Sequence, residues 1–185
     1  MPTRNITVSN TTCHSPFSIG NGDPGRMEYI EDVVFENCTV VGGLSPNDQR
    51  YRPRWWQTAL RVKGNPGANS TVRNITFSDI IVHDVDLVFD FAMHYACQNS
   101  SGMVNYNDCV AEQGEGGDGS IQPSVSGIHF SNVRGTAWRS GWLRCLAKFP
   151  CRDVTFAQIS VAADEPFLCE NVHATGWSLD RYRHV

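Results

Sequence analysis

The sequence lacks any run of 18 apolar residues, so it offers no candidate for a membrane-spanning helix. Charge is also scarce: 18% of the 185 residues are Asp, Glu, Lys or Arg, and the formal net charge is −4. Helical periodicity is missing apart from short stretches, whereas Gly, Asn, Ser and Thr are frequent, which is typical of strands and turns. We therefore expect one all-β domain over residues 1–185, with no membrane partner.

The cysteines also lack the CxxC pairs of a zinc site, so we expect disulfides and neither a metal nor another cofactor. Their number is odd, at seven. The N-x-S/T sequons lie at Asn5, Asn10, Asn37, Asn69, Asn74 and Asn99. Both features favour a secreted glycoprotein. No apolar segment follows Arg4, so a signal peptide is missing, which fits a secreted protein only if the chain is a fragment.

One short pattern occurs five times: Ile or Val, any residue, an apolar residue that is usually Phe, any residue, and then a polar amide or acid. The copies are 6–10, 33–37, 75–79, 128–132 and 154–158. In four of them Asn or Asp directly precedes the first apolar residue. The shortest spacings predict a repeat of about 25 residues, the size of one solenoid coil.

Longer spacings between the other copies predict insertions around residues 44–57 and 98–124. Each repeat also contains a second apolar stretch, such as Phe17-Ser-Ile19, Leu60-Arg-Val62 or Leu87-Val-Phe89. This arrangement predicts a right-handed parallel β-helix of about five coils, in which the recurring Phe side chains stack along the core. An antiparallel β-sandwich is the alternative, but it does not explain why the repeats share residue identity. The first copy begins near residue 1, so we expect no N-terminal coils and no cap.

Basic and aromatic residues are concentrated in the stretch 50–63, RYRPRWWQTALRVK, which contains no acid. If the end of this stretch forms a strand, the side chains of Arg61 and Lys63 project from one face, while those of Leu60 and Val62 point into the core. Cations beside flat rings suit an anionic ligand with flat faces, which fits an acidic polysaccharide or a single-stranded nucleic acid. The net negative charge, the cysteines and the sequons argue against nucleic acid.

Three segments in order resemble a known family. Residues 5–20 (NITVSNTTCHSPFSIG), residues 59–64 (ALRVKG) and Tyr95 resemble the C-terminal part of polygalacturonase-like enzymes, glycoside hydrolase family 28. The resemblance implies a parallel β-helix that hydrolyses glycosidic bonds of pectin with inversion. Arg61-Val62-Lys63 matches the Arg-Ile-Lys signature with one conservative change.

The resemblance implies that Arg61 and Lys63 hold a galacturonate carboxylate and that Tyr95 lines the same cleft. Either Trp55 or Trp56 is expected to stack on a sugar face, or else to pack the 44–57 loop onto the solenoid. His14 lies one residue before the position of the family's catalytic His, which falls on Ser15. It is thus a catalytic candidate or a turn histidine beside Pro16.

The family's two acidic signatures, Asn-Thr-Asp and Asp-Asp, are absent from the sequence. Inverting glycosidases need two carboxyl groups roughly 6.5–9.5 Å apart. Asp84, Asp86 and Asp90 follow Arg61 in the chain and are expected to be solvated turn or strand acids. The chain is therefore expected to be inactive alone, as the substrate-binding part of a glycosidase. The alternative is a non-catalytic β-helix that binds acidic polysaccharide or has a structural role.

The resemblance also implies the cysteine pairing. Cys145 and Cys151 match a short-loop disulfide near the family's C-terminus, and Cys97 with Cys109 is expected to close another loop. The partner of Cys13 would lie in a preceding segment. Cys38 occupies an inward repeat position, where we expect a buried thiol. The partner expected is pectin, and the protein is expected to be a secreted monomer.

Overall fold

The computed structural model describes residues 2–20, 27–42, 57–65, 68–93 and 123–176, and the backbone of 183–184. Their strands are β1 (Thr3–Ser9), β2 (Thr12–Cys13), β3 (Phe17–Ile19), β4 (Met27–Val41), β5 (Thr58–Lys63), β6 (Asn69–Ala92), β7 (Ser124–Arg144), β8 (Cys151–Glu165), β9 (Leu168–Glu170), β10 (Val172–Gly176) and β11 (Arg183–His184). Among these residues no helix is long and apolar enough to cross a membrane.

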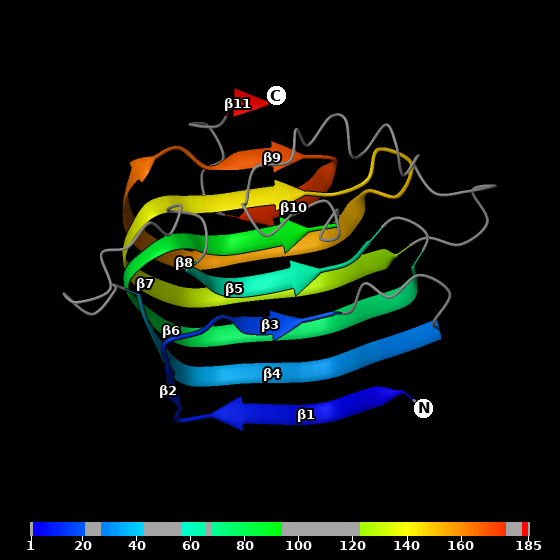
Figure 1. Ribbon diagram of the computed structural model, residues 1–185, viewed down its shortest axis with the longest axis horizontal. Coiled ribbons are helices and arrows are strands. Elements are labelled where there is room, and N and C mark those ends of the chain that lie inside the picture. The colour runs from blue at the N-terminus through cyan, green and yellow to red at the C-terminus, as the bar shows by residue number, and fades with distance from the viewer. Residues whose placement is uncertain are drawn as a thin grey trace, which may run out of the picture.

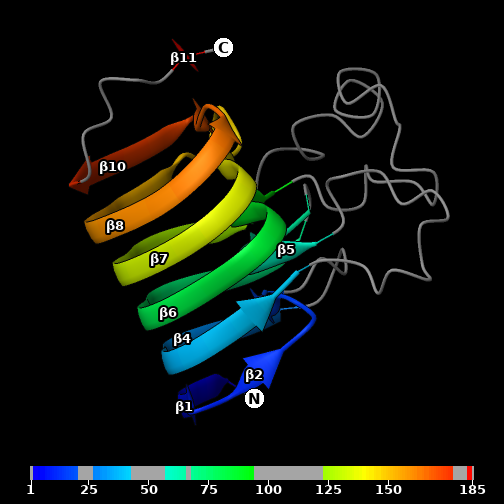
Figure 2. The same cartoon turned by 90° about the vertical axis from the view of Figure 1, so that its left-hand side faces the viewer.

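The strands form two stacks of parallel strands, joined along their length. The first stack runs β1-β4-β6-β7-β8-β10. The second runs β3-β5-β6-β7-β9-β11 and faces the viewer in Figure 1. β6 and β7 belong to both, because these long strands bend around the molecule, as their curved ribbons in Figure 2 show. The fold is the right-handed parallel β-helix that the repeat predicted.

The register of the first stack confirms the repeat. Ile6 pairs with Val33, Val33 with Ile75, Ile75 with Ile128, and Ile128 with Val154. β10 continues the stack as a sixth layer, in which Ala174 pairs with Val154 and Gly176 with Phe156. The small residues at these two positions explain why the Ile-x-Phe pattern did not reveal this layer.

Each copy of the repeat lies between two residues in the left-handed backbone region. Their φ angles are between 49° and 63°. The pairs are Asn5 with Asn10, Asp32 with Asn37, Asn74 with Asp79, Gly127 with Asn132, and Asp153 with Gln158. Asn, Asp and Gly adopt this conformation at lower cost than other residues, so they allow a bend without breaking the ladder. The polar residues that bracket the pattern therefore turn the chain around the coil.

Several of these amides also bind one another between coils. Asn37 Nδ2 donates to Asn10 Oδ1 at 2.6 Å, and Asn132 Nδ2 donates to Asp79 Oδ1 at the same distance. A third such bond joins Asn74 to Asp32. Asn10, Asn37 and Asn74 are sequon residues, and in this fold their amides bind between coils.

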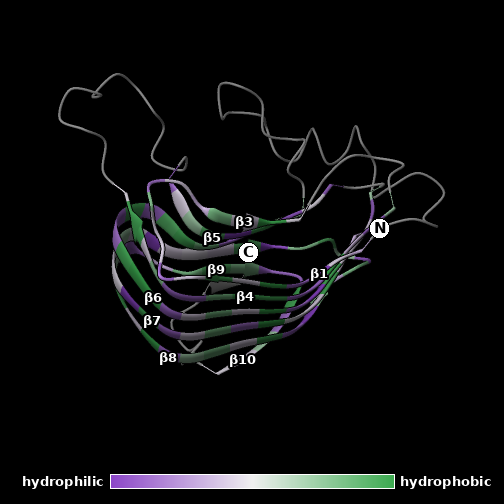
Figure 3. Ribbon diagram, turned by 90° about the horizontal axis from the view of Figure 1, so that it is seen from below, coloured by the Kyte–Doolittle hydropathy of each residue, from purple (hydrophilic) through white to green (hydrophobic). Residues whose placement is uncertain are grey.

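Phenylalanine stacking organises the core. The ring centroids of Phe35, Phe77, Phe130 and Phe156 lie 4.9, 5.2 and 5.0 Å apart in succession, with interplanar angles of 6°, 10° and 14°. This confirms the predicted stacking of like residues. Figure 3 shows hydrophobic and hydrophilic residues alternating along the bent strands, as expected when side chains alternate between core and solvent.

The second stack corrects one alignment of the repeats. Phe89 pairs with Leu60 and Phe91 with Val62, whereas Leu87 pairs with Thr58. The stretch equivalent to Leu60-Arg-Val62 is therefore 89–91, and not 87–89 as the sequence suggested. This shift of two residues places Asp90 beside Arg61.

Candidate functional site

The candidate site lies on the outer face of the second stack, around β5. Leu60 and Val62 are buried, at 1% and 0% exposure, and Arg61 and Lys63 between and after them are partly exposed. This alternation is the one predicted for the end of the 50–63 stretch. It directs both cations away from the core on the same face of the sheet.

Gly20 brings β3 close to β5 at the position of Lys63. Its φ is +102°, and a Cβ atom built there would lie 2.1 Å from the Lys63 carbonyl oxygen. Only glycine satisfies both the backbone angle and the close approach. The Gly20 that ends the Ser-Ile-Gly segment therefore supports the backbone that carries Lys63.

Two neighbours hold the Arg61 guanidinium. Its Nε donates to Asp90 Oδ2 at 2.7 Å, and its Nη2 donates to Thr58 Oγ1 at 2.6 Å. The Arg61 side chain is only 13% exposed, and that of Asp90 is 2% exposed. A hydrogen bond between opposite charges at this burial is stronger than one on the surface, so the plane of the guanidinium is fixed.

Asp90 is therefore not the solvated acid that the sequence suggested. It lies on β6 between Arg61 on β5 and Trp142 on β7, and Arg144 Nη2 lies 3.7 Å from its Oδ1. Arg61 donates to it on one side, and Arg144 lies at ion-pair distance on the other without a hydrogen bond to Oδ1. The two arginines thus cover an outward position that alternation alone would leave open. Of the other two acids, Asp84 is exposed, in keeping with the expectation, and Asp86 accepts a bond from the Gln57 backbone amide.

Beyond Asp90, the face continues as alternating cations and indoles. The Arg144 guanidinium carbon lies 4.1 Å from the centroid of a Trp142 ring, and that of Arg139 lies 5.4 Å from it. Both distances allow cation–π attraction. The Trp142 Nε1 atom is buried without a hydrogen-bond partner in the described part of the chain.

Charge changes sign along this face. What we call the cationic cluster comprises Arg61, Lys63, Arg144 and the single carboxylate of Asp90, which gives it a net charge of +2 (three minus one). Towards β9 the face becomes acidic, with Glu165 within 3.6 Å of Arg139 and Glu170 in register with Arg144. The β5 side thus suits an anionic ligand.

His14 is not joined to this cluster. It lies in the exposed segment between β2 and β3, and no hydrogen bond or ion pair links it to the described residues. The structure therefore leaves both interpretations of His14 standing, as a catalytic candidate and as a turn histidine.

The remaining predicted residues divide into two groups. Tyr95, Trp55, Trp56, Cys97 and Cys109 lie outside the described residues. Cys145 and Cys151 form the disulfide that the resemblance implied. Cys38 is a buried free thiol as predicted, and Cys13 and Cys169 are also free in the described part of the chain. That part contains no group of three His, Cys, Asp or Glu side chains that could hold a metal ion.

Trp142, Arg144 and Asp90 were missed as site residues. The available signal was their outward position in strands aligned with Arg61-Val62-Lys63. That alignment depends on the layer to which each apolar stretch belongs, and the insertion around 98–124, which separates Asp90 from Trp142 and Arg144 in the chain, prevents its calculation from spacing alone.

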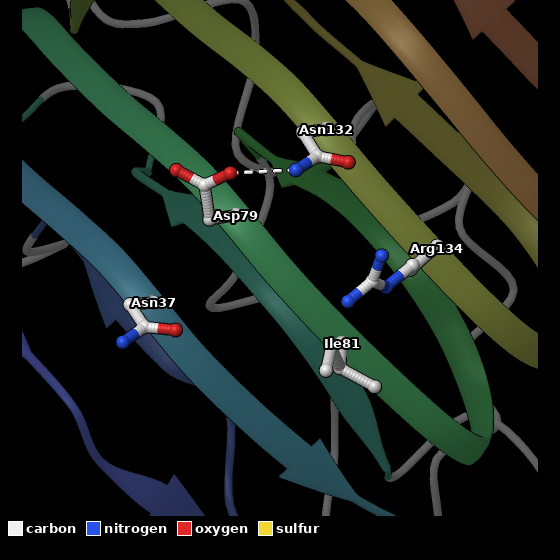
Figure 4. A pocket seen from close by; sticks show the side chains of 5 residues that line it. All are labelled: Asn37, Asp79, Ile81, Asn132 and Arg134. Atoms are coloured by element: carbon white, nitrogen blue, oxygen red, sulfur yellow. Dashed lines mark hydrogen bonds between the residues drawn. The ribbon is translucent and has the colours of Figure 1, made fainter.

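A separate polar pocket of about 210 Å³ lies on the outer side of the bend after the Phe-bearing segments. Figure 4 shows its lining, with Asn132 bound to Asp79 and Arg134 beside Ile81. Its walls come from β4, β6 and β7 and none from β5. The pocket is therefore not part of the cationic cluster.

Comparison with known proteins finds relatives that match most of this chain. Exopolygalacturonase rpg15 of Rhizopus delemar is 31% identical over 163 residues, which are 84% of this chain and 36% of that relative. An exopolygalacturonase of Oenothera organensis is 29% identical, over 93% of this chain and 43% of that relative. A putative galacturan 1,4-alpha-galacturonidase A of Aspergillus flavus is 26% identical, again over 93% of this chain and 43% of that relative.

The chain spans about two fifths of the length of these curated relatives. No solved structure matched it. The model of the family described as Glycosyl hydrolases family 28 matches residues 2–178, nearly the whole chain and all of the cationic cluster. A parallel β-helix with an Arg-Val-Lys strand on its outer face, matched over this length, places the chain in glycosyl hydrolases family 28.

Proposed function

We propose that this chain is the galacturonate-binding part of a polygalacturonase-type glycosidase, which hydrolyses glycosidic bonds of pectin with inversion. The observation that carries the proposal is the outward pair Arg61 and Lys63 on β5, within a family whose relatives here are named as galacturonan-degrading enzymes. Guanidinium and ammonium groups two residues apart on one strand face bind a carboxylate from one side.

The polymer would lie along the stack, parallel to the axis of the solenoid. Neighbouring strands are roughly 4.8 Å apart, so cations on successive layers meet successive positions along an extended ligand. Arg144 lies two layers beyond Lys63, in the row Lys63, Ala92, Arg144. In this proposal Tyr95 lines the same cleft, and Trp55 or Trp56 stacks on a sugar face.

Hydrolysis is assigned to the whole enzyme and not to this chain alone. The sequence contains neither Asn-Thr-Asp nor Asp-Asp, and inversion requires two carboxyl groups on opposite sides of the bond. The buried Asp90 is already bound by two arginines, which makes it unsuited to protonate a leaving group or to activate water. His14 is proposed only as an assistant to those carboxyl groups.

We further propose that the protein acts outside the cell as a monomer. The Cys145–Cys151 disulfide supports this location, because such bonds persist in oxidising compartments. The sequons also support this location. Because the amides of Asn37 and Asn74 form hydrogen bonds between coils, Asn5, Asn69 and Asn99 are the better candidates for a glycan.

Binding of tetragalacturonate, measured by isothermal titration calorimetry, tests the proposal. We expect the Arg61→Ala/Lys63→Ala double variant to bind at least about tenfold more weakly than the wild type, since a charge-assisted contact contributes about 1.5–3 kcal/mol. The matched control is Arg134→Ala/Arg152→Ala, which removes two exposed cations elsewhere. Equal affinity of the two double variants would contradict the assignment of Arg61 and Lys63.

A further inference from the structure

Asp90 is the one buried carboxylate of the cationic cluster, and it contacts arginines from two other strands. Its Oδ2 accepts from Arg61 Nε at 2.7 Å, and its Oδ1 lies 3.7 Å from Arg144 Nη2. The side chains of Arg61 and Arg144 are 13% and 11% exposed, against 2% for Asp90. The acid thus lies beneath both cations.

The alternation of the strands explains this geometry. Phe89 and Phe91 are fully buried, so the side chain of Asp90 between them must project from the outer face of the strand. In-register pairing then places it next to Arg61 on one side and Trp142 on the other. The Trp142 ring in turn lies against Arg144, which directs that guanidinium back towards Asp90.

A buried negative charge reduces the repulsion between the cations of the cluster. Arg61 and Lys63 lie on β5, and Arg144 lies on β7, two layers away. Arg61 and Arg144 are largely withdrawn from water, where like charges repel strongly. A carboxylate between them offsets this repulsion. Because Arg61 donates through Nε, the bond also sets the orientation of the guanidinium plane relative to the sheet.

We propose that Asp90 is a positioning residue, which holds Arg61 and Arg144 in the orientation that receives successive carboxylates of a polyuronate. This inference rests on the proposed function, because it assigns a partner role within the same site. Asp90 touches no ligand in this scheme and acts through the arginines alone. Asparagine, the neutral isostere of Asp, should therefore still position Arg61 in part.

The test compares Asp90→Asn with Asp90→Ala in the whole chain. The two variants carry the same charge, so any difference between them reports hydrogen bonding and not electrostatic attraction. Asn Oδ1 still accepts from Arg61 Nε, whereas Ala accepts nothing. We expect Asp90→Ala to bind tetragalacturonate about tenfold more weakly than the wild type. Asp90→Asn should bind it at least threefold more tightly than Asp90→Ala.

The charge control is Asp164→Asn, which removes one exposed carboxylate from β8 and should leave affinity within twofold of the wild type. Equal affinities for Asp90→Asn and Asp90→Ala would overturn the positioning role. Loss of the folded state in Asp90→Asn, judged by circular dichroism, would also overturn it, in favour of a purely structural counter-charge.

A second readout needs no ligand. The Nε–H resonance of Arg61 in a ¹⁵N correlation spectrum, assigned by its loss in Arg61→Lys, should be shifted from the average and exchange slowly in the wild type. In Asp90→Ala it should return to the solvent-exposed average. A wild-type Arg61 resonance already at that average would sink the inference, whereas a wild type that binds no tetragalacturonate would contradict the proposed function alone.

Discussion

Asp90 and Arg61 occupy equivalent outward positions on neighbouring strands, yet their surroundings differ. Arg61 has a long side chain that reaches across to a neighbour, and Asp90 has a short one that its neighbours cover. Alternation correctly predicted which way each residue points. It did not predict exposure, because exposure depends on the side chains of adjacent layers.

Cys169 illustrates the same effect on a thiol. It lies on β9 beside Glu170, and burial, followed by the charge of Glu170, raises the pKa of its thiol from 9.0 to about 12. Since the thiolate is the nucleophile, the folded protein should react slowly at this position at pH 8. The free energy of unfolding should also decline as the pH rises from about 9 to 12, because the folded state retains a proton that the unfolded chain loses.

We expect iodoacetamide to modify Cys169 at least about a hundredfold more slowly in the folded protein than in denaturant, since each pKa unit changes the thiolate fraction about tenfold. Peptide mass spectrometry measures both rates, and Cys169→Ala should remove part of the stability decline above pH 9. Similar rates in the two states would show that the Cys169 thiol is not buried and that its pKa is not raised.

At the scale of the element, the coil depends on two features that recur in the sequence. Residues with positive φ at both ends of each repeat bend the strand, and between them a Phe, or Val8 in the first copy, packs in or against the core. β6 shows both, with Asn74 and Asp79 around Phe77. The same strand then continues to Asp90, so the bend and the cationic cluster belong to one element.

Phe77 lies in the middle of the ring stack, between Phe35 and Phe130, and is fully buried. Phe77→Ala should lower the free energy of unfolding by about 3–5 kcal/mol, because it removes a large apolar side chain and leaves a cavity. Urea denaturation followed by circular dichroism measures the loss. Phe149→Ala, at a partly buried position beside the core, is the comparison and should cost less; an equal cost would argue against the stack as the main source of stability.

For the whole molecule, the proposed function separates binding from hydrolysis. The cationic cluster lies within residues 58–144, whereas the acidic signatures of the family are missing from the sequence. The two stacks share β6 and β7, so the cluster is formed on the same strands as the core. The proposed ligand binding therefore requires that the solenoid folds, and does not require catalysis.

We accordingly expect the purified chain to release no reducing ends from polygalacturonate, while it still binds tetragalacturonate. A reducing-sugar assay, with an active pectin-degrading enzyme as the positive control in the same buffer, measures this. Release of reducing ends above the blank, in proportion to the amount of this chain, would contradict the assignment of catalysis to acids outside it.

The sequence by itself determined the coil. Its repeat of Ile or Val, Phe and a terminal amide specifies which residues enter the core and where the backbone turns, because both depend on local alternation and on the conformational freedom of Asn, Asp and Gly. The resemblance added the family, through Arg61, Lys63 and the Ser-Ile-Gly segment. The Cys145–Cys151 disulfide also followed from it.

Only the tertiary structure decided which outward side chains meet. The coils differ in length, so the pairing of Asp90 with Arg61 and the approach of Arg144 depend on the register between strands 29 and 54 residues apart in the chain (61 to 90, and 90 to 144). Register is set by the packing of the core and not by local sequence. For that reason Arg61 and Lys63 were visible as site residues in the sequence, whereas Arg144 and the acid between the two arginines were not.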